Sequence, residues 1–178
     1  ESAKTEAWVI LEKGPEARIF AGLKTGMTAS GLLQAIVRGT VPEQLASFTP
    51  AIGDAVLIPA GTVHSLGDVV VFEVQQNSDV TFRLYDWDQI DPKTGRRRLL
   101  QEQQAKACVD FSRGAILPIT PQADDTKPVP RESLIDCRHF GVTRMTGAVS
   151  FVVGSPQLAR VLVCLSGEGR LEHSGVSY

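Results

Sequence analysis

The sequence predicts a mainly β protein built from short antiparallel strands. Its 178 residues include sixteen glycines and ten prolines, which interrupt many short runs of β-branched and apolar residues. Runs of this kind, bounded by turn residues, are typical of strands. Four of them fall between residues 54 and 85, and this close spacing leaves no room for helical crossovers. We therefore expect an antiparallel sheet or barrel.

The chain is expected to open with two strands and then a helix. The runs at residues 7–11 and 17–21 predict strands joined by a turn at residues 13–15, where a glycine precedes a proline. Thr28 can then cap a helix that ends at Gly39. The apolar face of this helix is made by Leu32, Leu33, Ile36 and Val37.

The later elements are mostly short strands. A second short helix is expected from Pro42 through Leu45 to Phe48, and a third helix over about 99–109. The strands are expected at 54–59, 62–66, 69–75, 80–85, and then at about 137–145, 148–153, 160–165 and 170–173. Residues 118–133 contain four prolines and few apolar residues, so this segment is interpreted as a connector between two units.

The composition excludes several classes of function. The chain is 43% hydrophobic and 21% charged, as is usual for a globular domain, and its net charge of −2 provides no basic surface for nucleic acid. Its apolar runs are far shorter than the roughly 20 residues of a membrane span. Cys108, Cys137 and Cys164 are odd in number and lack C-x-x-C spacing. They are interpreted as reduced, mostly buried thiols of a cytoplasmic protein.

His64 is the first candidate for chemistry. It follows the turn Pro59-Ala-Gly61 and has Val63 and Leu66 as apolar neighbours. A lone histidine at a strand end is commonly satisfied by a backbone carbonyl, and this structural interpretation stays open. The fixed turn and the apolar neighbours favour a held, partly buried imidazole, which is a good metal ligand. His173 is expected to be exposed, and His139 to face either way.

Glu6 and Arg83 are ambiguous from the residues alone. Glu6 stands next to an expected strand and close to Lys4, a position typical of a solvated terminal carboxylate. Alternation along residues 80–85 places Arg83 on the face opposite Phe82 and Leu84, and this face is either solvated or the lining of a barrel. In the second case the guanidinium would suit a sugar phosphate or a developing oxyanion. The basic run at 96–98 is interpreted as a solvated loop.

Four segments together form a longer pattern. They are Lys4-Thr-Glu-Ala-Trp8, Ile19-Phe-Ala-Gly-Leu-Lys24, Ile58-Pro-Ala-Gly-Thr-Val-His-Ser65, and Glu73-Val-Gln-Gln-Asn-Ser-Asp79 followed by Phe82-Arg-Leu-Tyr-Asp-Trp87. The chain thereby resembles type I mannose-6-phosphate isomerase, a two-cupin metalloenzyme, and most closely its shorter bacterial members. The last two segments are specific, because several uncommon residues recur in order at the family's spacing. The resemblance is strong over most of residues 3–110 and looser from 137 onward.

The resemblance implies a fold and a division into domains. The fold is a cupin, a double-stranded β-helix or jelly roll, with a short helical insertion at about 28–48. Residues 1–117 are expected to form a catalytic cupin domain, 118–133 the connector, and 134–178 the beginning of a second cupin. The chain resembles an internal fragment, with both cupins incomplete.

The resemblance also assigns site residues. The family binds one zinc ion per active site through a Gln-x-His pair, a glutamate in a K-T-E-x-W stretch and the histidine of P-x-G-T-x-H. The last two fall on Glu6 and His64, which replaces the solvated interpretation of Glu6. The family's catalytic arginine falls on Arg83, and its active-site lysine falls on Lys4. The Gln-x-His pair lies upstream in the family and does not occur in this sequence.

The activity implied by the resemblance is the interconversion of mannose 6-phosphate and fructose 6-phosphate through a zinc-assisted enediol. The expected partner is a small sugar phosphate, with neither nucleic acid nor membrane involved. Two other classes stay open. One is a non-catalytic, sugar-sensing cupin derived from the isomerase. The other is a different metal-dependent cupin enzyme, such as an oxygenase, which would need an H-x-H pair with a nearby glutamate on an early hairpin.

Overall fold

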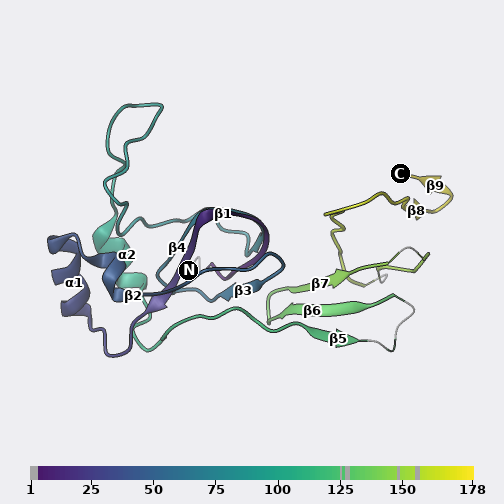
Figure 1. Cartoon of the computed structure of the whole chain (residues 1–178), viewed down its shortest axis with the longest axis horizontal. Helices are drawn as coiled ribbons and strands as arrows, with labels where there is room; N and C mark the ends of the chain where they lie inside the picture. The colour runs from purple at the N-terminus through teal and green to yellow at the C-terminus, as the bar shows by residue number, and fades with distance from the viewer. Residues whose placement is uncertain (1–3, 125, 127–128, 148, 155–156) are drawn as a thin grey trace. The chain divides into compact units, whose positions relative to one another are not determined.

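The computed structural model describes residues 4–124, 126, 129–147, 149–154 and 157–178. The chain divides into two compact units, Glu1–Thr146 and Gly147–Tyr178 (Figure 1). None of the helices in the described part is long and apolar enough to cross a membrane. Four residues of predicted segments, Asp125, Lys127 and Pro128 of the connector and Ala148 of a strand, lie outside the described residues.

The first unit is organised around one long strand. β1 (Glu6–Leu23) pairs antiparallel along one edge with β4 (His64–Gln75). Its other edge pairs with β3 (Ala55–Ile58) near its start and with β2 (Leu45–Phe48) near its end, as the ribbon in Figure 1 shows. The fold is thus mainly β, as predicted, and β1 is the element that joins the other three strands into one sheet.

The prediction of a turn at residues 13–15 is wrong, because β1 continues through these residues with a bulge. The register between β1 and β4 shifts between residues 13 and 18. A carboxylate oxygen of Asp68 accepts a 2.8 Å hydrogen bond from the backbone N–H of Glu16. A Cβ at Gly14 would lie 2.1 Å from this carboxylate, so any other residue there would have to displace the Asp68 side chain. The local sequence cannot reveal this, because the partner that holds the bulge lies on another strand.

The predicted ends of the first helix are confirmed, but the second helix does not form as predicted. In α1 (Ala29–Arg38), the Thr28 side chain accepts a hydrogen bond from the backbone N–H of Gly31, and Gly39 ends the helix with φ of 70°. The short helix expected through Phe48 is instead a 3₁₀ turn, η1 (Val41–Gln44), followed directly by β2. Pairing with β1 takes over from local helical preference at this point. α2 (Glu102–Cys108) lies within its predicted range.

Three further strands form a second antiparallel sheet in the order β5-β6-β7. They are β5 (Gln122–Asp124), β6 (Arg131–Asp136) and β7 (Gly141–Met145). The strand predicted at residues 137–145 therefore begins late, because 137–140 form the turn of the β6–β7 hairpin. In the second unit, β8 (Glu172–His173) pairs with β9 (Val176–Ser177). The strand predicted at residues 160–165 does not form.

The core of the first unit has three parts. One lies on the sheet and consists of the buried side chains Trp8, Ile10, Ile19, Ala21, Val56 and Ile58. A second joins the helices to the end of β1 and includes Leu23, Leu32, Ala35, Val41, Leu45, Leu84 and Ala105. The third packs Leu134 and Ile135 of β6 against Ala7, Val9 and Ala55. Each large apolar side chain buried in this way contributes on the order of 1.5–3 kcal/mol. This packing holds the strands that carry Glu6 and His64.

Candidate active site

The four residues predicted to form the site line a single cavity. It has a volume of about 950 Å³ and is bounded by Lys4, Glu6, His64 and Arg83 among others. Its walls come from the start of β1, the turn before β4, the segment at 80–87 and the end of α2. Residues that are far apart in the sequence therefore meet around one volume of a size suited to a small polar ligand.

Glu6 and His64 approach each other from two paired strands. Glu6 is 4% exposed, and its Oε2 lies 3.7 Å from Nε2 of His64. Nδ1 of His64 is 2.8 Å from the carbonyl oxygen of Thr62. Because a carbonyl can only accept, Nδ1 carries the proton in the neutral ring, and the lone pair is left on Nε2, the nitrogen nearer Glu6. The Trp8 ring packs edge-on against the imidazole with centroids 5.4 Å apart and restricts its tilt.

The turn before His64 is anchored on several sides. Gly61 has φ of 85°, and the backbone N–H of Thr62 donates to the carbonyl of Pro59. The carbonyl of Gly61 accepts a 2.9 Å hydrogen bond from the backbone N–H of Asp110. A Cβ at Gly61 would lie 3.0 Å from the carbonyl oxygen of Cys108, so the turn is also closely packed. The position of the imidazole is therefore set by the backbone as well as by its own hydrogen bond.

Lys4 offsets the charge of the buried glutamate. Its Nζ lies 2.7 Å from Oε1 of Glu6 and donates a 3.2 Å hydrogen bond to the side chain of Gln75. Gln75 in turn donates through its Nε2 to the carbonyl of Ser78. This chain of contacts ties the lysine to the end of β4, so its ammonium group is held at the cavity wall instead of moving freely in solvent.

Glu73 is a site-adjacent residue that the sequence did not single out. On β4 it stands opposite Trp8, one pleat from the pair formed by Gln75 and Glu6. Burial raises the pKa of the Glu73 carboxyl above its usual value, and repulsion by the Glu6 carboxylate, to which it is hydrogen-bonded, raises it further. Glu73 and Gln75 are two residues apart and therefore point to the same face of β4. This spacing could have placed Glu73 near Glu6, but only once the register of β4 on β1 was known.

Arg83 reaches the cavity from an irregular segment. The strand predicted at residues 80–85 is wrong, because this stretch has no strand partner in the described structure. Its backbone is fixed instead by Gln101, whose side chain accepts from the N–H of Arg83 and whose own N–H donates to the carbonyl of Arg83. The Nε atom of Arg83 lies 3.4 Å from a carboxylate oxygen of Asp86. Its side chain is 30% exposed.

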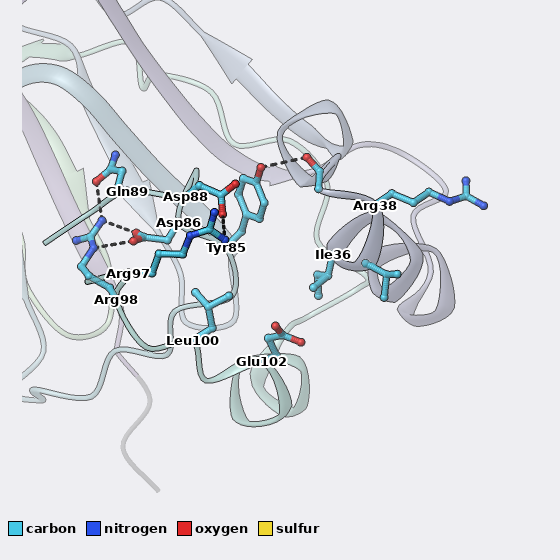
Figure 2. Close-up of a pocket in the computed structure, with 12 residues that line it drawn as sticks. Ile36, Arg38, Tyr85, Asp86, Asp88, Gln89, Arg97, Arg98, Leu100 and Glu102 are labelled. Carbon is cyan, nitrogen blue, oxygen red and sulfur yellow. Dashed lines mark hydrogen bonds and ion pairs between the residues drawn. The ribbon is translucent and has the colours of Figure 1, made fainter. Parts of the chain in front are cut away.

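A second, smaller cavity of about 370 Å³ adjoins the same segment (Figure 2). There the guanidinium of Arg98 makes two hydrogen bonds to Asp86 and a third, of 2.7 Å, to the side chain of Gln89. The hydroxyl of Tyr85 donates to the carbonyl of Gly39 and so ties the segment to the end of α1. The basic run at 96–98 is thus not simply solvated, since Arg98 is part of the wall of both cavities.

The donor atoms of Glu6 and His64 fit half of a zinc site. Two ligands about 2.1 Å from a tetrahedral zinc ion stand roughly 3.4 Å apart, close to the 3.7 Å seen between Oε2 and Nε2. A carboxylate and a neutral imidazole are both donors that zinc prefers. Within the described residues, no group of three or more His, Cys, Asp or Glu side chains could hold a metal ion.

Among the described residues, neither the remaining histidines nor the cysteine thiols form a hydrogen bond or ion pair with Glu6 or His64. Nε2 of His139 accepts a hydrogen bond from Arg138 in the β6–β7 turn, and His173 lies exposed in β8. The expectation of mostly buried thiols is wrong, because Cys108 and Cys164 are exposed and Cys137 is half-buried. All three cysteines are free.

No family model matches the chain, but individual relatives do. It is 32% identical over 176 residues to mannose-6-phosphate isomerase ManA of Bacillus subtilis, covering 96% of this chain and 54% of the relative. A mannose-6-phosphate isomerase of Streptococcus mutans is 29% identical over 96% of the chain and 53% of its own length. The chain thus spans about half the length of the curated relatives it matches.

Solved structures agree with this relationship. The crystal structure of the mannose 6-phosphate isomerase from Bacillus subtilis aligns with a TM-score of 0.70 and 28% identity over 80% of this chain and 45% of that one. A putative mannosephosphate isomerase from Archaeoglobus fulgidus, at 17% identity and a TM-score of 0.52, shares the fold. The chain is therefore a cupin. More narrowly, it is a homologue of the mannose-6-phosphate isomerases, and the resemblance seen in its sequence is confirmed.

Proposed function

We propose that the full-length protein carrying this sequence interconverts mannose 6-phosphate and fructose 6-phosphate. The observation that carries the proposal is the convergence of Lys4, Glu6, His64 and Arg83 on one cavity, with Glu6 and His64 spaced as zinc ligands. The relatives from Bacillus subtilis and Streptococcus mutans are named as enzymes of the same reaction, which supports the proposal. Because the chain spans about half of their length, the proposal concerns the whole protein.

Glu6 and His64 would hold the metal, one zinc ion per active site. The hydrogen bond from Nδ1 to the Thr62 carbonyl presents Nε2 in the form that binds metal. Burial of Glu6 beside Lys4 keeps its carboxylate in place. When bound, zinc supplies Lewis-acid stabilisation of negative charge on the oxygens of the substrate. The resemblance assigns the other two ligands to a Gln-x-His pair that is not part of residues 1–178.

Arg83 and Lys4 would supply the remaining positive charge. Isomerisation moves a proton between C1 and C2 of the opened sugar, and negative charge builds up on the adjacent oxygens. A guanidinium fixed at the cavity wall stabilises such charge without having to reorganise during the reaction. Lys4, held between Glu6 and Gln75, would serve the same polar pocket as a hydrogen-bond donor. The same two cations would also attract a phosphorylated, anionic substrate.

The domain assignment and the cellular setting are part of the proposal. Residues 1–117 would form the catalytic cupin with its helical insertion at about 28–48, 118–133 the connector, and 134–178 the beginning of a second cupin. The three free cysteines fit a reducing environment such as the cytoplasm.

A sugar-sensing cupin is the alternative that the experiment must separate from an enzyme. The full-length protein is purified, its zinc content is measured, and fructose 6-phosphate formation from mannose 6-phosphate is followed in a coupled assay. The isomerase proposal predicts turnover that chelation removes and added zinc restores. A protein that binds zinc and sugar phosphate without turnover would be the sensor. An oxygenase would instead consume dioxygen, which an oxygen electrode detects.

A further inference from the structure

We propose that Asp86 is a positioning residue that holds the Arg83 guanidinium in the orientation that the reaction needs. Arg98 balances the negative charge of Asp86, so that the three side chains together remain cationic. This inference rests on the proposed function of Arg83. It starts from a carboxylate to which neither the sequence nor the resemblance gives a role, and which lies between two guanidinium groups. The side chain of Asp86 is only 11% exposed and lines both cavities.

The geometry divides the carboxylate between two partners. Nε of Arg98 donates a 2.7 Å hydrogen bond to Oδ2 of Asp86, and Nη2 of Arg98 donates to Oδ1 (Figure 2). The same Oδ1 lies 3.4 Å from Nε of Arg83. Side-on pairing through Nε leaves the outer nitrogens of the Arg83 guanidinium for other partners. A carboxylate bound in this fork cannot rotate freely, so it provides a fixed reference point for Arg83.

The charges explain why two arginines share one aspartate. An isolated pair of Arg83 and Asp86 would be neutral and would attract a sugar phosphate weakly. With Arg98 included, the trio carries a net charge of +1 beside the cavity. Arg98 is held in turn by Gln89, whose side-chain oxygen accepts a 2.7 Å hydrogen bond from its Nη2. The arrangement thereby places the Arg83 guanidinium beside a fixed carboxylate, at 3.4 Å, and still leaves positive charge for an anionic ligand.

The backbone of Arg83 is already fixed, and this makes the role of Asp86 specific. Two hydrogen bonds with Gln101 hold the main chain of Arg83 at the start of α2. Loss of the Asp86 carboxylate therefore should not displace the segment. It should release only the guanidinium, which would then be repelled by Arg98 with no carboxylate between them.

The test uses Asp86→Asn in the full-length protein, with Asp88→Asn as a matched control. Asp88 lies in the same loop but pairs with Arg97 on the surface, where both side chains are about 70% exposed, and it does not line the larger cavity. Asparagine tolerates the positive φ of Asp88. For Asp86→Asn we expect unchanged zinc content, a fall in kcat on the order of 100-fold, and a much smaller change in KM. Asp88→Asn should keep kcat, and Asp86→Glu should recover part of it. A wild-type kcat in Asp86→Asn would overturn the inference.

A second measurement does not depend on turnover. The Nε–H signal of Arg83 in ¹H–¹⁵N spectra, assigned by its loss in Arg83→Lys, should shift and broaden in Asp86→Asn and stay in place in Asp88→Asn. An unchanged signal would refute the positioning role even if the protein is not an isomerase, so the two proposals fail separately. If Asp86→Asn does not fold, Arg98→Gln replaces it: the Asp86 carboxylate then loses its fork, so the Arg83 signal should broaden and KM for the sugar phosphate should rise. A KM that does not change would contradict the charge argument.

Discussion

The two halves of the candidate site are held in different ways. Glu6 and His64 stand on paired strands, where backbone hydrogen bonds of β1, β3 and β4 fix both residues. Arg83 stands on an irregular segment that is fixed by side chains, namely Gln101 and Asp86. The sheet thus holds the two proposed metal ligands in a rigid frame, and the irregular segment holds the cation that is proposed to meet the substrate.

This difference has a consequence for mutation. A ligand on a paired strand can be removed without moving its neighbours, because the backbone ladder does not depend on the side chain. A residue on the irregular segment depends on a few specific side-chain contacts, so conservative changes several residues away can matter. Variants of Glu6 or His64 should therefore lose both metal and activity, whereas variants of Arg83 should lose activity alone.

The largest effect is expected for His64→Ala, which breaks the sheet-held half. Removing the imidazole leaves Glu6 as the single ligand from residues 1–178, beside the proposed Gln-x-His pair of the full-length protein, and a site that loses one of its four protein ligands holds zinc more weakly. In the full-length protein we expect loss of stoichiometric zinc, measured by elemental analysis, together with loss of turnover. The matched control is His173→Ala in the exposed β8 strand, which should leave zinc content unchanged. Stoichiometric zinc in His64→Ala would refute the ligand assignment.

Arg83→Ala tests the irregular segment and should separate metal binding from turnover. The main-chain hydrogen bonds with Gln101 do not need the arginine side chain, so the fold and the metal site should persist. Removing a fixed positive group that stabilises developing charge typically costs on the order of 100- to 1,000-fold in kcat. We expect a loss of this size, measured in the coupled assay at full zinc occupancy. Unchanged turnover would show that Arg83 has no role in the reaction.

Gly61→Ala should perturb the frame of the site moderately. The new Cβ would meet the carbonyl oxygen of Cys108 at 3.0 Å, and φ of 85° is unfavourable for alanine. Strain of this kind costs on the order of 1–3 kcal/mol of unfolding free energy, which urea titration measures. Because the turn positions His64, zinc affinity should fall as well. Gly67→Ala is the control, since a methyl group added there would meet no atom within 4 Å. Equal stability of the two variants would contradict the prediction.

The smallest effect concerns a contact away from the cavity. A 2.6 Å hydrogen bond from Arg144 lowers the pKa of the Glu132 carboxyl, and Arg144 also donates to the carbonyl of Gly53. Because the folded-state pKa is depressed, the contribution to stability is complete above the unfolded pKa and disappears as pH falls through the folded value. Glu132→Gln should cost less than about 1 kcal/mol near neutral pH.

Urea titrations at neutral and acidic pH measure this difference. The stability of Glu132→Gln should approach that of the wild type as the pH falls below the ordinary glutamate pKa. Glu12→Gln, at an exposed position on β1, should show no such convergence. A difference for Glu132→Gln that does not depend on pH would show that the ion pair is not its cause.

Much of the fold was predictable because its signals are local. The cap at Thr28 and the stop at Gly39 bound α1 as expected, and the runs of strand-forming residues located β3 and the two parts of β4. The bulge in β1 was not predictable, because Asp68 holds it from another strand. The strand expected over 80–85 failed for a related reason: alternation describes a strand, but a strand also needs a partner edge.

The candidate site follows the same rule. The residues around His64 indicated a held imidazole, since a fixed turn and apolar neighbours are local features. Glu6 looked solvated by itself, and only its register against β3 and β4 explains why it is 4% exposed. The nearby Glu73 was missed because its proximity to Glu6 depends on that same register. Long-range pairing is the information that a single sequence does not display.

The most direct test of the proposed zinc site is the position of zinc in the full-length protein. Crystals grown with the metal and measured at the zinc absorption edge give an anomalous difference map that locates the ion independently of activity. We expect a peak within about 2.0–2.2 Å of Oε2 of Glu6 and Nε2 of His64. A peak elsewhere, with Glu6 and His64 still paired to each other, would contradict it.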